Sequence, residues 1–429
     1  MIASSPMIAS SVPQPDVENN APRLLLPADD VASPELSIVI PALNEGLTIG
    51  QFVDWCQEGL RRTQVRGEVL IIDSSSDATA EIALSKGARV LKVPKRGLGR
   101  AYIDAIPFIR GDYVLLGDAD CTYDFRNLGP FMAKFRDGYE YVMGSRFKGH
   151  IENDAMPPMH RYFGNPLTTW ILNILYGSGF SDIHCGMRGV STEALKRMNL
   201  QSQSWQYASE MIIKSVHLGL RTTEVPVTFY KDIEGRESHL KRIGWWSPWV
   251  AGWISLQAML IWGADFFLLR PGLVVFVLGA IGVTALFHGP VLLWGIGFSL
   301  HWMLLFLLLS LVGLQLFLMG ILARALYGCP NHQRPWQTVF RFNPAVLVST
   351  VLFIGGTLSL LPLAREYYSY HYRLPPILTA PSFQAVAGLG LVMWGFIHFT
   401  FSMVYNAVLL STKSTSNVSK PQTMLMKGN

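Results

Sequence analysis

Three long stretches of the chain contain no Asp, Glu, Lys or Arg, and they constrain its fold more than any other feature. They run from Pro271 to Ala323, from Ala345 to Ala364 and from Leu374 to Thr412. A helix needs about 20 apolar residues to cross a bilayer core. The first stretch is long enough for two such helices, broken near residues 288–290, and each of the others holds one. The sequence therefore predicts four transmembrane helices within residues 266–412.

The positions of Lys and Arg around these helices predict their orientation. Cations occur after the second helix and after the fourth, at Arg324, Arg334, Arg341, Lys413, Lys420 and Lys427. Cytoplasmic loops are enriched in Lys and Arg, and an even number of spans leaves both ends of the chain on one side. We therefore expect an integral protein of the cell's inner (plasma) membrane, with the region before the spans and the tail, residues 413–429, in the cytoplasm.

Composition excludes several other classes. The formal net charge of +5 is small for 429 residues; it suits a surface of anionic lipid, and no nucleic-acid-binding motif is present. Cys56, Cys121, Cys185 and Cys329 are scattered without a Cys-x-x-Cys pair, which favours reduced thiols and argues against zinc. Residues 1–34 are rich in Ser, Pro, Ala and Asn and lack the pattern of a signal peptide, so we expect a disordered leader.

Residues 35–230 alternate short β-branched runs with helical patterns, which is typical of an α/β domain with a mostly parallel sheet. Ligands of such sheets bind beyond the carboxyl ends of the strands, so functional residues should directly follow them. The expected strands are Leu36–Ile40, Val69–Ile72, Arg89–Val93, Tyr113–Leu116, Tyr141–Met143 and Thr223–Phe229.

Two carboxylates, Asp118 and Asp120, follow the apolar run 113–117. Oxygen ligands suit Mg²⁺ or Mn²⁺, and such a cation would hold a substrate diphosphate at the rim of the sheet. An Asp-x-Asp after a strand is also common as a turn and helix cap. The metal hypothesis therefore depends on the surrounding motifs.

Other polar residues follow the first three expected strands. Asp73 is placed to accept hydrogen bonds from a base or ribose, whereas Asp77 is expected to cap the helix that starts at Ala78. The segment from Lys95 to Arg100 opens a helix with two glycines, Gly97 among them, and three cations, which suits a phosphate. Arg100 could instead be simply solvated.

Three further polar motifs occur later in the chain: Gly144-Ser145-Arg146, residues 182–188 and residues 207–210. In this order, the motifs make residues 35–245 resemble the inverting family-2 glycosyltransferases of the A-type fold. Within that family the chain is most similar to polyprenyl-phosphate sugar synthases, such as dolichol-phosphate mannose synthase and its bacterial glucosyltransferase relatives.

The resemblance implies roles for individual residues. The donor nucleotide sugar would contact Pro41, Asn44, Glu45, Asp73, Lys95, Gly97 and Asp118. Asp118 and Asp120 would position the metal, and the acceptor lipid phosphate would contact Arg146, Arg236 and Ser238. The sequence departs from the family's usual motifs at residues 74–76, at residues 121–123 and at His239. The identity of the donor and the detailed contacts with the acceptor therefore stay open.

The segment 231–265 is expected to form amphipathic helices in the membrane interface. It begins with a cation-rich run, Lys231 to Arg242, followed by Trp245, Trp246, Trp249 and Trp253, and both residue types favour the headgroup region. Positive-inside topology with an aromatic belt would explain Lys241 and Arg242 equally well.

The leading hypothesis is transfer of a hexose from a UDP- or GDP-linked sugar to a polyprenyl phosphate, undecaprenyl or dolichyl, with inversion. One alternative is a transferase that makes a glycolipid or polysaccharide from an alcohol. A remoter one is a nucleotide-binding scaffold or transporter, against which the charge-free spans argue. The sugar, the nucleotide base and the oligomeric state stay open, with a homo-oligomer as one alternative.

Overall fold

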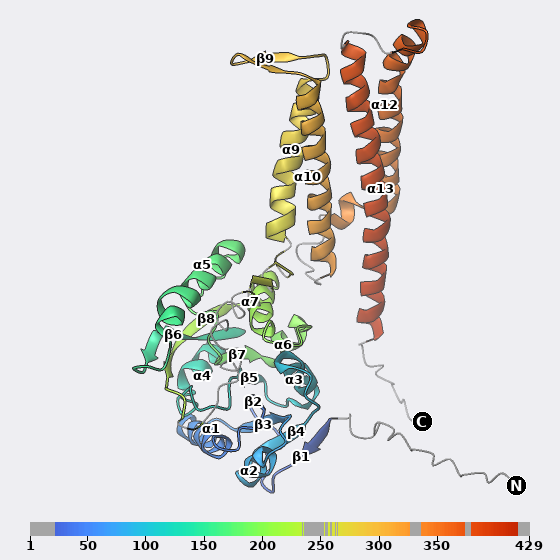
Figure 1. Ribbon diagram of the computed structural model, residues 1–429. Helices are drawn as coiled ribbons and strands as arrows, with labels where there is room; N and C mark the ends of the chain where they lie inside the picture. The colour runs from blue at the N-terminus through green and yellow to red at the C-terminus, as the bar shows by residue number, and fades with distance from the viewer. Residues whose placement is uncertain are drawn as a thin grey trace, which may run out of the picture. The chain divides into compact units, whose positions relative to one another are not determined.

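The structure is a computed structural model of the chain. It describes residues 22–233, 265–326, 336–373 and 379–418, together with positions 235, 253, 256, 257, 260, 261 and 263. The chain divides into two compact units between Ser255 and Leu256. The first unit contains a large sheet and its helices, and the second contains long apolar helices (Figure 1).

An eight-stranded sheet forms the centre of the first unit, in the order β1-β4-β3-β2-β5-β7-β6-β8. Strands β4, β3, β2 and β5 are parallel. Because β7 is antiparallel to both β5 and β6, strands β6 and β8 run in the same direction as β5. The bounds are Arg23–Leu25 (β1), Leu36–Ala42 (β2), Gly67–Asp73 (β3), Arg89–Lys92 (β4), Tyr113–Leu116 (β5), Tyr141–Ile151 (β6), Arg188–Ser191 (β7) and Thr222–Phe229 (β8).

Helices cover this sheet and bury its central strands. In β2 only Pro41 is not fully buried, and β3 is buried from Glu68 to Asp73. Continuous apolar runs of this kind are expected where helices cover both faces of parallel strands. The helices are α1 (Ile49–Thr63), α2 (Thr79–Ser85), α3 (Leu98–Ala105), α4 (Gly129–Arg136), α5 (Asn165–Tyr176), α6 (Thr192–Met198) and α7 (Tyr207–His217).

The six strands expected from the sequence are confirmed, and β6 extends well beyond its predicted end at Met143 to Ile151. Two strands of this sheet, β1 and β7, were not expected. The four residues of β7, Arg-Gly-Val-Ser, show no alternation that would predict a strand, and the strand forms because its backbone bonds to β5 on one side and β6 on the other.

The prediction of a disordered leader over residues 1–34 is wrong from Arg23 onward. Strand β1 pairs antiparallel with β4, with Leu24 opposite Leu91. Asp30 forms an ion pair of 2.7 Å with Arg110, which also pairs with the buried Glu68 at 2.6 Å. These partners lie far away in the sequence, so local composition could not reveal them. Residues 1–21 lie outside the described part of the chain.

Within its described residues, the second unit contains four helices that are long and apolar enough to cross a membrane, at the positions predicted from the sequence. Helices of sufficient length and hydropathy cover Phe266–Ala285, Leu300–Leu326, Phe342–Ser369 and Ala380–Leu410. They correspond to η5 (Asp265–Leu269) continued by α9 (Arg270–Ala285), to α10 (Leu300–Leu326), to α12 (Phe342–Ser369) and to α13 (Ala380–Val418). Because α13 continues to Val418, the first residues of the predicted tail 413–429 are helical.

Glycines allow these helices to pack closely. A Cβ atom at Gly356 would lie 2.5 Å from the Gly388 carbonyl oxygen, and one at Gly313 of α10 would lie 2.1 Å from the Phe276 nitrogen of α9. The expected break near residues 288–290 is also present. It leads into an unexpected hairpin of β9 (Val291–Leu293) and β10 (Ile296–Phe298), which separates α9 from α10 (Figure 1).

Candidate active site

Asp118 and Asp120 lie in the turn that directly follows β5, as the sequence predicts. The Asp120 Oδ1 atom accepts hydrogen bonds from the Thr122 amide at 3.0 Å and from the Thr122 hydroxyl at 2.6 Å. The turn passes through Cys121, whose φ of 59° is uncommon for a residue other than glycine. Strained backbone of this kind persists only where its surroundings fix it, so the turn holds the Asp120 carboxylate in a defined orientation.

The loop 182–187 packs directly against Asp118. A Cβ atom at Gly186 would lie 2.3 Å from Asp118 Oδ2 and 3.0 Å from a ring carbon of Tyr123, so only glycine fits there. The Gly186 amide also donates a hydrogen bond of 2.8 Å to the Tyr123 hydroxyl. Burial, with a smaller contribution from the Asp118 charge, raises the pKa of Tyr123. The ring therefore stays neutral beside the carboxylate.

The loops after β2 and β3 bond to each other. The Asn44 amide donates to the Ser75 hydroxyl at 2.7 Å, and the Ser76 amide donates to Asn44 Oδ1 at 3.0 Å. Asp73 ends β3 opposite Ala42 of β2 and accepts a hydrogen bond of 3.2 Å from the Ser75 amide. Burial raises the pKa of Asp73. Since β3, β2 and β5 are parallel neighbours, Asp73, Asn44 and Asp118 lie at one edge of the sheet.

Asp77 lies one residue before the N-cap of α2, which is Ala78, so the N-cap position expected for Asp77 is off by one residue. Its Oδ1 atom accepts a hydrogen bond of 3.1 Å from the Thr79 amide, and its Oδ2 atom accepts one of 3.2 Å from the Gly46 amide. The Thr79 hydroxyl also accepts a bond of 3.0 Å from the Glu45 amide. Asp77 and Thr79 thereby hold the first loop, so their role is structural.

The two glycines at the start of α3 are explained by close packing. A Cβ atom at Gly97, whose φ is 113°, would lie 2.3 Å from the Gln203 carbonyl oxygen, and one at Gly99 would lie 2.1 Å from that of Ser202. These contacts join α3 to the loop before α7. The expected phosphate contact at Gly97 stays a prediction.

The cations of the same motif are not all available to a ligand. Arg96 and Arg100 both form ion pairs with Asp104, at 2.9 and 2.8 Å. Lys95 is exposed. Of the three, Lys95 is therefore the best candidate to contact an anionic donor.

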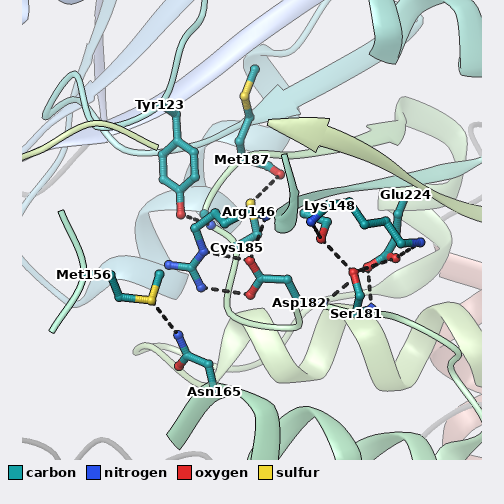
Figure 2. A network of polar contacts seen from close by, with 12 residues as sticks. Tyr123, Arg146, Lys148, Met156, Asn165, Ser181, Asp182, Cys185, Met187 and Glu224 are labelled. Atoms are coloured by element: carbon teal, nitrogen blue, oxygen red, sulfur yellow. Dashed lines mark hydrogen bonds and ion pairs between the residues drawn. The ribbon is translucent and has the colours of Figure 1, made fainter. Parts of the chain in front are cut away.

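Arg146 forms a buried ion pair with Asp182 (Figure 2). The guanidinium donates through Nε to Asp182 Oδ2 at 2.7 Å and through Nη2 to Oδ1 at 2.8 Å. The Arg146 amide donates to the same carboxylate at 3.1 Å. Burial would raise the pKa of Asp182, but these hydrogen bonds and the Arg146 charge outweigh burial and lower it. The pair is therefore ionised, and Asp182 fixes the arginine expected to bind phosphate.

His184 lies beside this pair in a neutral form. Its Nε2 atom is 2.7 Å from the Thr168 hydroxyl of α5. Burial first, and then the Arg146 charge, lower the pKa of His184 to about 4. At neutral pH the imidazole therefore bears no charge, which avoids repulsion with Arg146.

A cleft of about 460 Å³ opens next to Arg146. Two guanidinium groups and an imidazole line it, and none of the lining residues in the described part of the chain is acidic. Arg161, on the π-helical turn η3 (His160–Gly164) before α5, supplies the second guanidinium. No motif marked Arg161, so sequence reasoning missed it. The lining residues are Arg146, Phe147, Gly149, His150, Ile151, Asn153, Arg161, Tyr162 and Pro166.

Glu210, in the motif at the start of α7, is fully buried. Its carboxylate accepts hydrogen bonds from the Gln201 amide at 2.9 Å and the Ser202 amide at 2.8 Å, and it pairs with Lys214 at 2.6 Å. Such a carboxylate stabilises the loop before α7, and it is poorly placed to remove a proton from a substrate.

In the part of the chain that the structure describes, no group of three or more His, Cys, Asp or Glu side chains is arranged to hold a metal ion. The pair Asp118 and Asp120 still fits Mg²⁺ or Mn²⁺, because such ions are often held by one or two carboxylates together with substrate phosphates and water. The predicted acceptor residues Arg236 and Ser238 lie outside the described residues.

Comparisons with known proteins agree with this arrangement. Residues 37–198 match the family model for glycosyl transferase family 2. The chain is 35% identical over 392 residues to the low-salt glycan biosynthesis hexosyltransferase Agl6 of Haloferax volcanii, covering 89% of this chain and 92% of that protein. A dolichyl-phosphate hexose transferase of the same organism is 30% identical over 195 residues, covering 46% of this chain and 82% of that protein.

Among solved structures, mannosyl-3-phosphoglycerate synthase from Rubrobacter xylanophilus aligns with a TM-score of 0.41 at 22% identity, over 53% of this chain and 74% of that one. The sheet order and the residues at its edge agree with the A-type glycosyltransferase fold expected from the sequence. The extent of the similarity to Agl6 and the family-model match establish that the chain is a glycosyltransferase and belongs to glycosyl transferase family 2.

Proposed function

We propose that the enzyme transfers a hexose from a nucleotide sugar to the phosphate of a membrane polyprenol, with inversion at the anomeric carbon. The observation that carries this proposal is the cleft beside Arg146, which is lined by Arg146 and Arg161 and, among the residues that the structure describes, by no acidic side chain. Guanidinium groups bind phosphate through charge-assisted hydrogen bonds. A carboxylate in the cleft would repel a phosphate, so the lining favours a phosphorylated acceptor over an alcohol.

A phosphate acceptor would also not need a general base. A phosphate monoester has a second pKa near 6, so it is largely dianionic at neutral pH. One of its oxygens can attack the anomeric carbon directly while the bond from that carbon to the donor diphosphate breaks. No proton has to be removed, and the burial of Glu210 agrees with this. Alignment and charge stabilisation would then supply most of the rate enhancement.

We assign donor binding to the edge formed by β3, β2 and β5. Asp73, next to Asn44, would accept hydrogen bonds from the base or ribose. Mg²⁺ or Mn²⁺ held by Asp118 and Asp120 would neutralise charge on the departing diphosphate. Arg161 would hold the acceptor phosphate, and Asp182 keeps Arg146 oriented beside it. The Lys and Arg distribution around the spans supports a site on the cytoplasmic face.

The direct test is a product assay with purified protein in liposomes. The protein is incubated with Mg²⁺ or Mn²⁺, polyprenyl phosphate and a panel of labelled UDP- and GDP-sugars, and the lipid products are separated. We expect one donor to give a labelled lipid that mild acid releases as free sugar. Transfer to unphosphorylated polyprenol, with none to the phosphate, would contradict the proposal.

The alternative with an alcohol acceptor has a specific candidate base. His150 lines the cleft and is exposed, so its imidazole could act as a general base on a hydroxyl bound there. If the acceptor is an alcohol, His150→Gln should abolish transfer. If it is a phosphate, this change should lower the rate by less than about 10-fold, below the usual contribution of a general base.

A further inference from the structure

Helix α5 has an unusual distribution of polar and apolar residues. Its polar side chains form hydrogen bonds with the rest of the domain. The Thr168 hydroxyl lies 2.7 Å from His184 Nε2, and the side-chain amide of Asn173 donates to the Phe180 carbonyl at 2.7 Å. Its outward side chains are apolar, with Trp170 61% and Ile174 52% exposed. A helix on the surface of a soluble domain shows the reverse pattern.

The exposed apolar residues form one continuous stripe that starts before α5. Their spacings of four, four, three and four residues place them on one side of a helix. The stripe covers 16 residues, and the 15 steps between its ends correspond to roughly 22 Å of helix at 1.5 Å per residue. It consists of Met159, Phe163, Leu167, Trp170 and Ile174, each at least 39% exposed.

The opposite side of α5 accounts for the packing that the fold requires. Leu172 and Leu175 are buried, and Thr169 is 5% exposed. The outward stripe is therefore not needed to attach the helix to the sheet. Large exposed apolar patches mark sites of interaction with a protein or a membrane. We therefore expect this surface to contact one of the two.

We propose that the η3–α5 stripe lies in the lipid headgroup region and inserts its apolar side chains among the acyl chains. Three observations favour lipid over a protein partner. The same chain carries four helices able to span a membrane, so the domain is tethered close to a bilayer. Trp170 and Tyr162, the latter 74% exposed, are residue types enriched at that boundary. No Asp or Glu occurs from Ala155 to Ser181, where Arg161 is the one fully charged residue.

The stripe is also continuous with the cleft described above. Tyr162 and Pro166 line that cleft and belong to the same helical segment. A helix resting in the interface would therefore bring the mouth of the cleft to the depth of lipid phosphates. This inference concerns membrane contact, and it does not depend on which sugar or acceptor the enzyme uses.

The test places a fluorophore on the stripe of the full-length protein. Trp170→Cys is labelled with an environment-sensitive dye and reconstituted into liposomes of phosphatidylcholine and phosphatidylglycerol. Arg62→Cys, in the last turn of α1, is the matched control, because Arg62 is likewise exposed and helical. Cys56, Cys121 and Cys185 are buried, and the unsubstituted protein treated with dye gives the background.

We expect nitroxide-labelled lipid to quench the dye at position 170, and iodide in the water to leave it unaffected. The dye at position 62 should show the opposite response. Equal quenching by iodide at both positions would overturn the proposal, because the stripe would then face water. Shielding of position 170 from both quenchers, with energy transfer between labelled copies, would also overturn it and assign the stripe to a contact between two chains.

A second variant guards against misfolding of the labelled protein. Leu167→Gln with Trp170→Gln should leave the thermal unfolding temperature in detergent nearly unchanged, because both side chains point away from the domain. The same pair should reduce the share of protein whose η3–α5 segment is protected from added protease in liposomes. A large loss of thermal stability in detergent would show that the stripe packs on protein, against the proposal.

Discussion

Arg146 and Asp182 form a buried ion pair of two side-chain hydrogen bonds between the middle of β6 and the loop before β7. Removing one partner of a buried ion pair leaves an uncompensated charge, which typically costs about 3 to 5 kcal/mol. The pair joins residues 36 positions apart and borders the cleft proposed for the acceptor. It therefore connects the stability of the domain to the geometry of the site.

We predict that Asp182→Asn lowers the free energy of unfolding by about 3 kcal/mol, because the charge of Arg146 stays buried without its counter-ion. Thermal unfolding in detergent would measure this. The double variant Arg146→Met with Asp182→Leu should be less destabilised than Asp182→Asn, because no buried charge remains. A double variant that is clearly less stable than Asp182→Asn would show that the ion pair itself stabilises the fold.

Asp120→Asn should reduce transfer at least 10-fold at any concentration of Mg²⁺ or Mn²⁺, since it removes a charged oxygen ligand with little change in volume. Asp118→Asn should also be damaging, to a smaller extent. Asp54→Asn is the control, because Asp54 forms only an exposed pair with Lys86, and such pairs contribute at most about 1 kcal/mol. Turnover by Asp120→Asn at the rate of Asp54→Asn would remove Asp120 from the site.

Arg161→Ala should raise the KM for polyprenyl phosphate about 10-fold or more and leave the KM for the nucleotide sugar nearly unchanged. A hydrogen bond to a charged group contributes about 1.5 to 3 kcal/mol. Arg236→Ala is expected to act in the same direction. Arg197→Ala is the matched control, because Arg197 forms a partly exposed pair with Glu140. If Arg161→Ala weakens donor binding alone, the cleft belongs to the diphosphate.

The rate with saturating donor should rise from pH 6.5 and flatten above about pH 7, as the second ionisation of the acceptor phosphate is completed. Initial rates between pH 6.5 and 8.5 would measure this. His150→Gln should preserve the shape of the profile. A profile that continues to rise to pH 8.5, or one that His150→Gln flattens, would indicate that an enzyme group removes a proton.

His184 should make the domain less stable in mild acid. Its pKa is about 4 in the folded protein and about 6.5 in an unfolded chain, so between these values the unfolded state binds more protons. Stability is therefore fully present above pH 6.5 and falls toward pH 4, by up to about 3 kcal/mol. Thermal unfolding between pH 7 and pH 5 should show this decrease, and His184→Gln should reduce it. An equal decrease in both proteins would assign it to other groups.

The sequence determined the features that depend on neighbouring residues. Runs without charge predicted the four spans, and apolar β-branched runs predicted six of the strands, because a helix or strand is recognised within its own length. The positions of Asp73, Asn44 and Asp118 at one edge also followed from the sequence, since parallel strands bring their carboxyl ends together.

Only the tertiary structure decided which side chains meet. Asp182 pairs with Arg146, Glu210 is buried against the loop before α7, and Arg161 lines the cleft. Strand β1 formed within the expected leader for the same reason, because its partner β4 lies more than 60 residues away. The energy of an ion pair and the burial of a side chain depend on distances between atoms in space. The sequence pattern shows which residues could bind a ligand, and the packing of distant segments determines which of them lie close enough together to form a site.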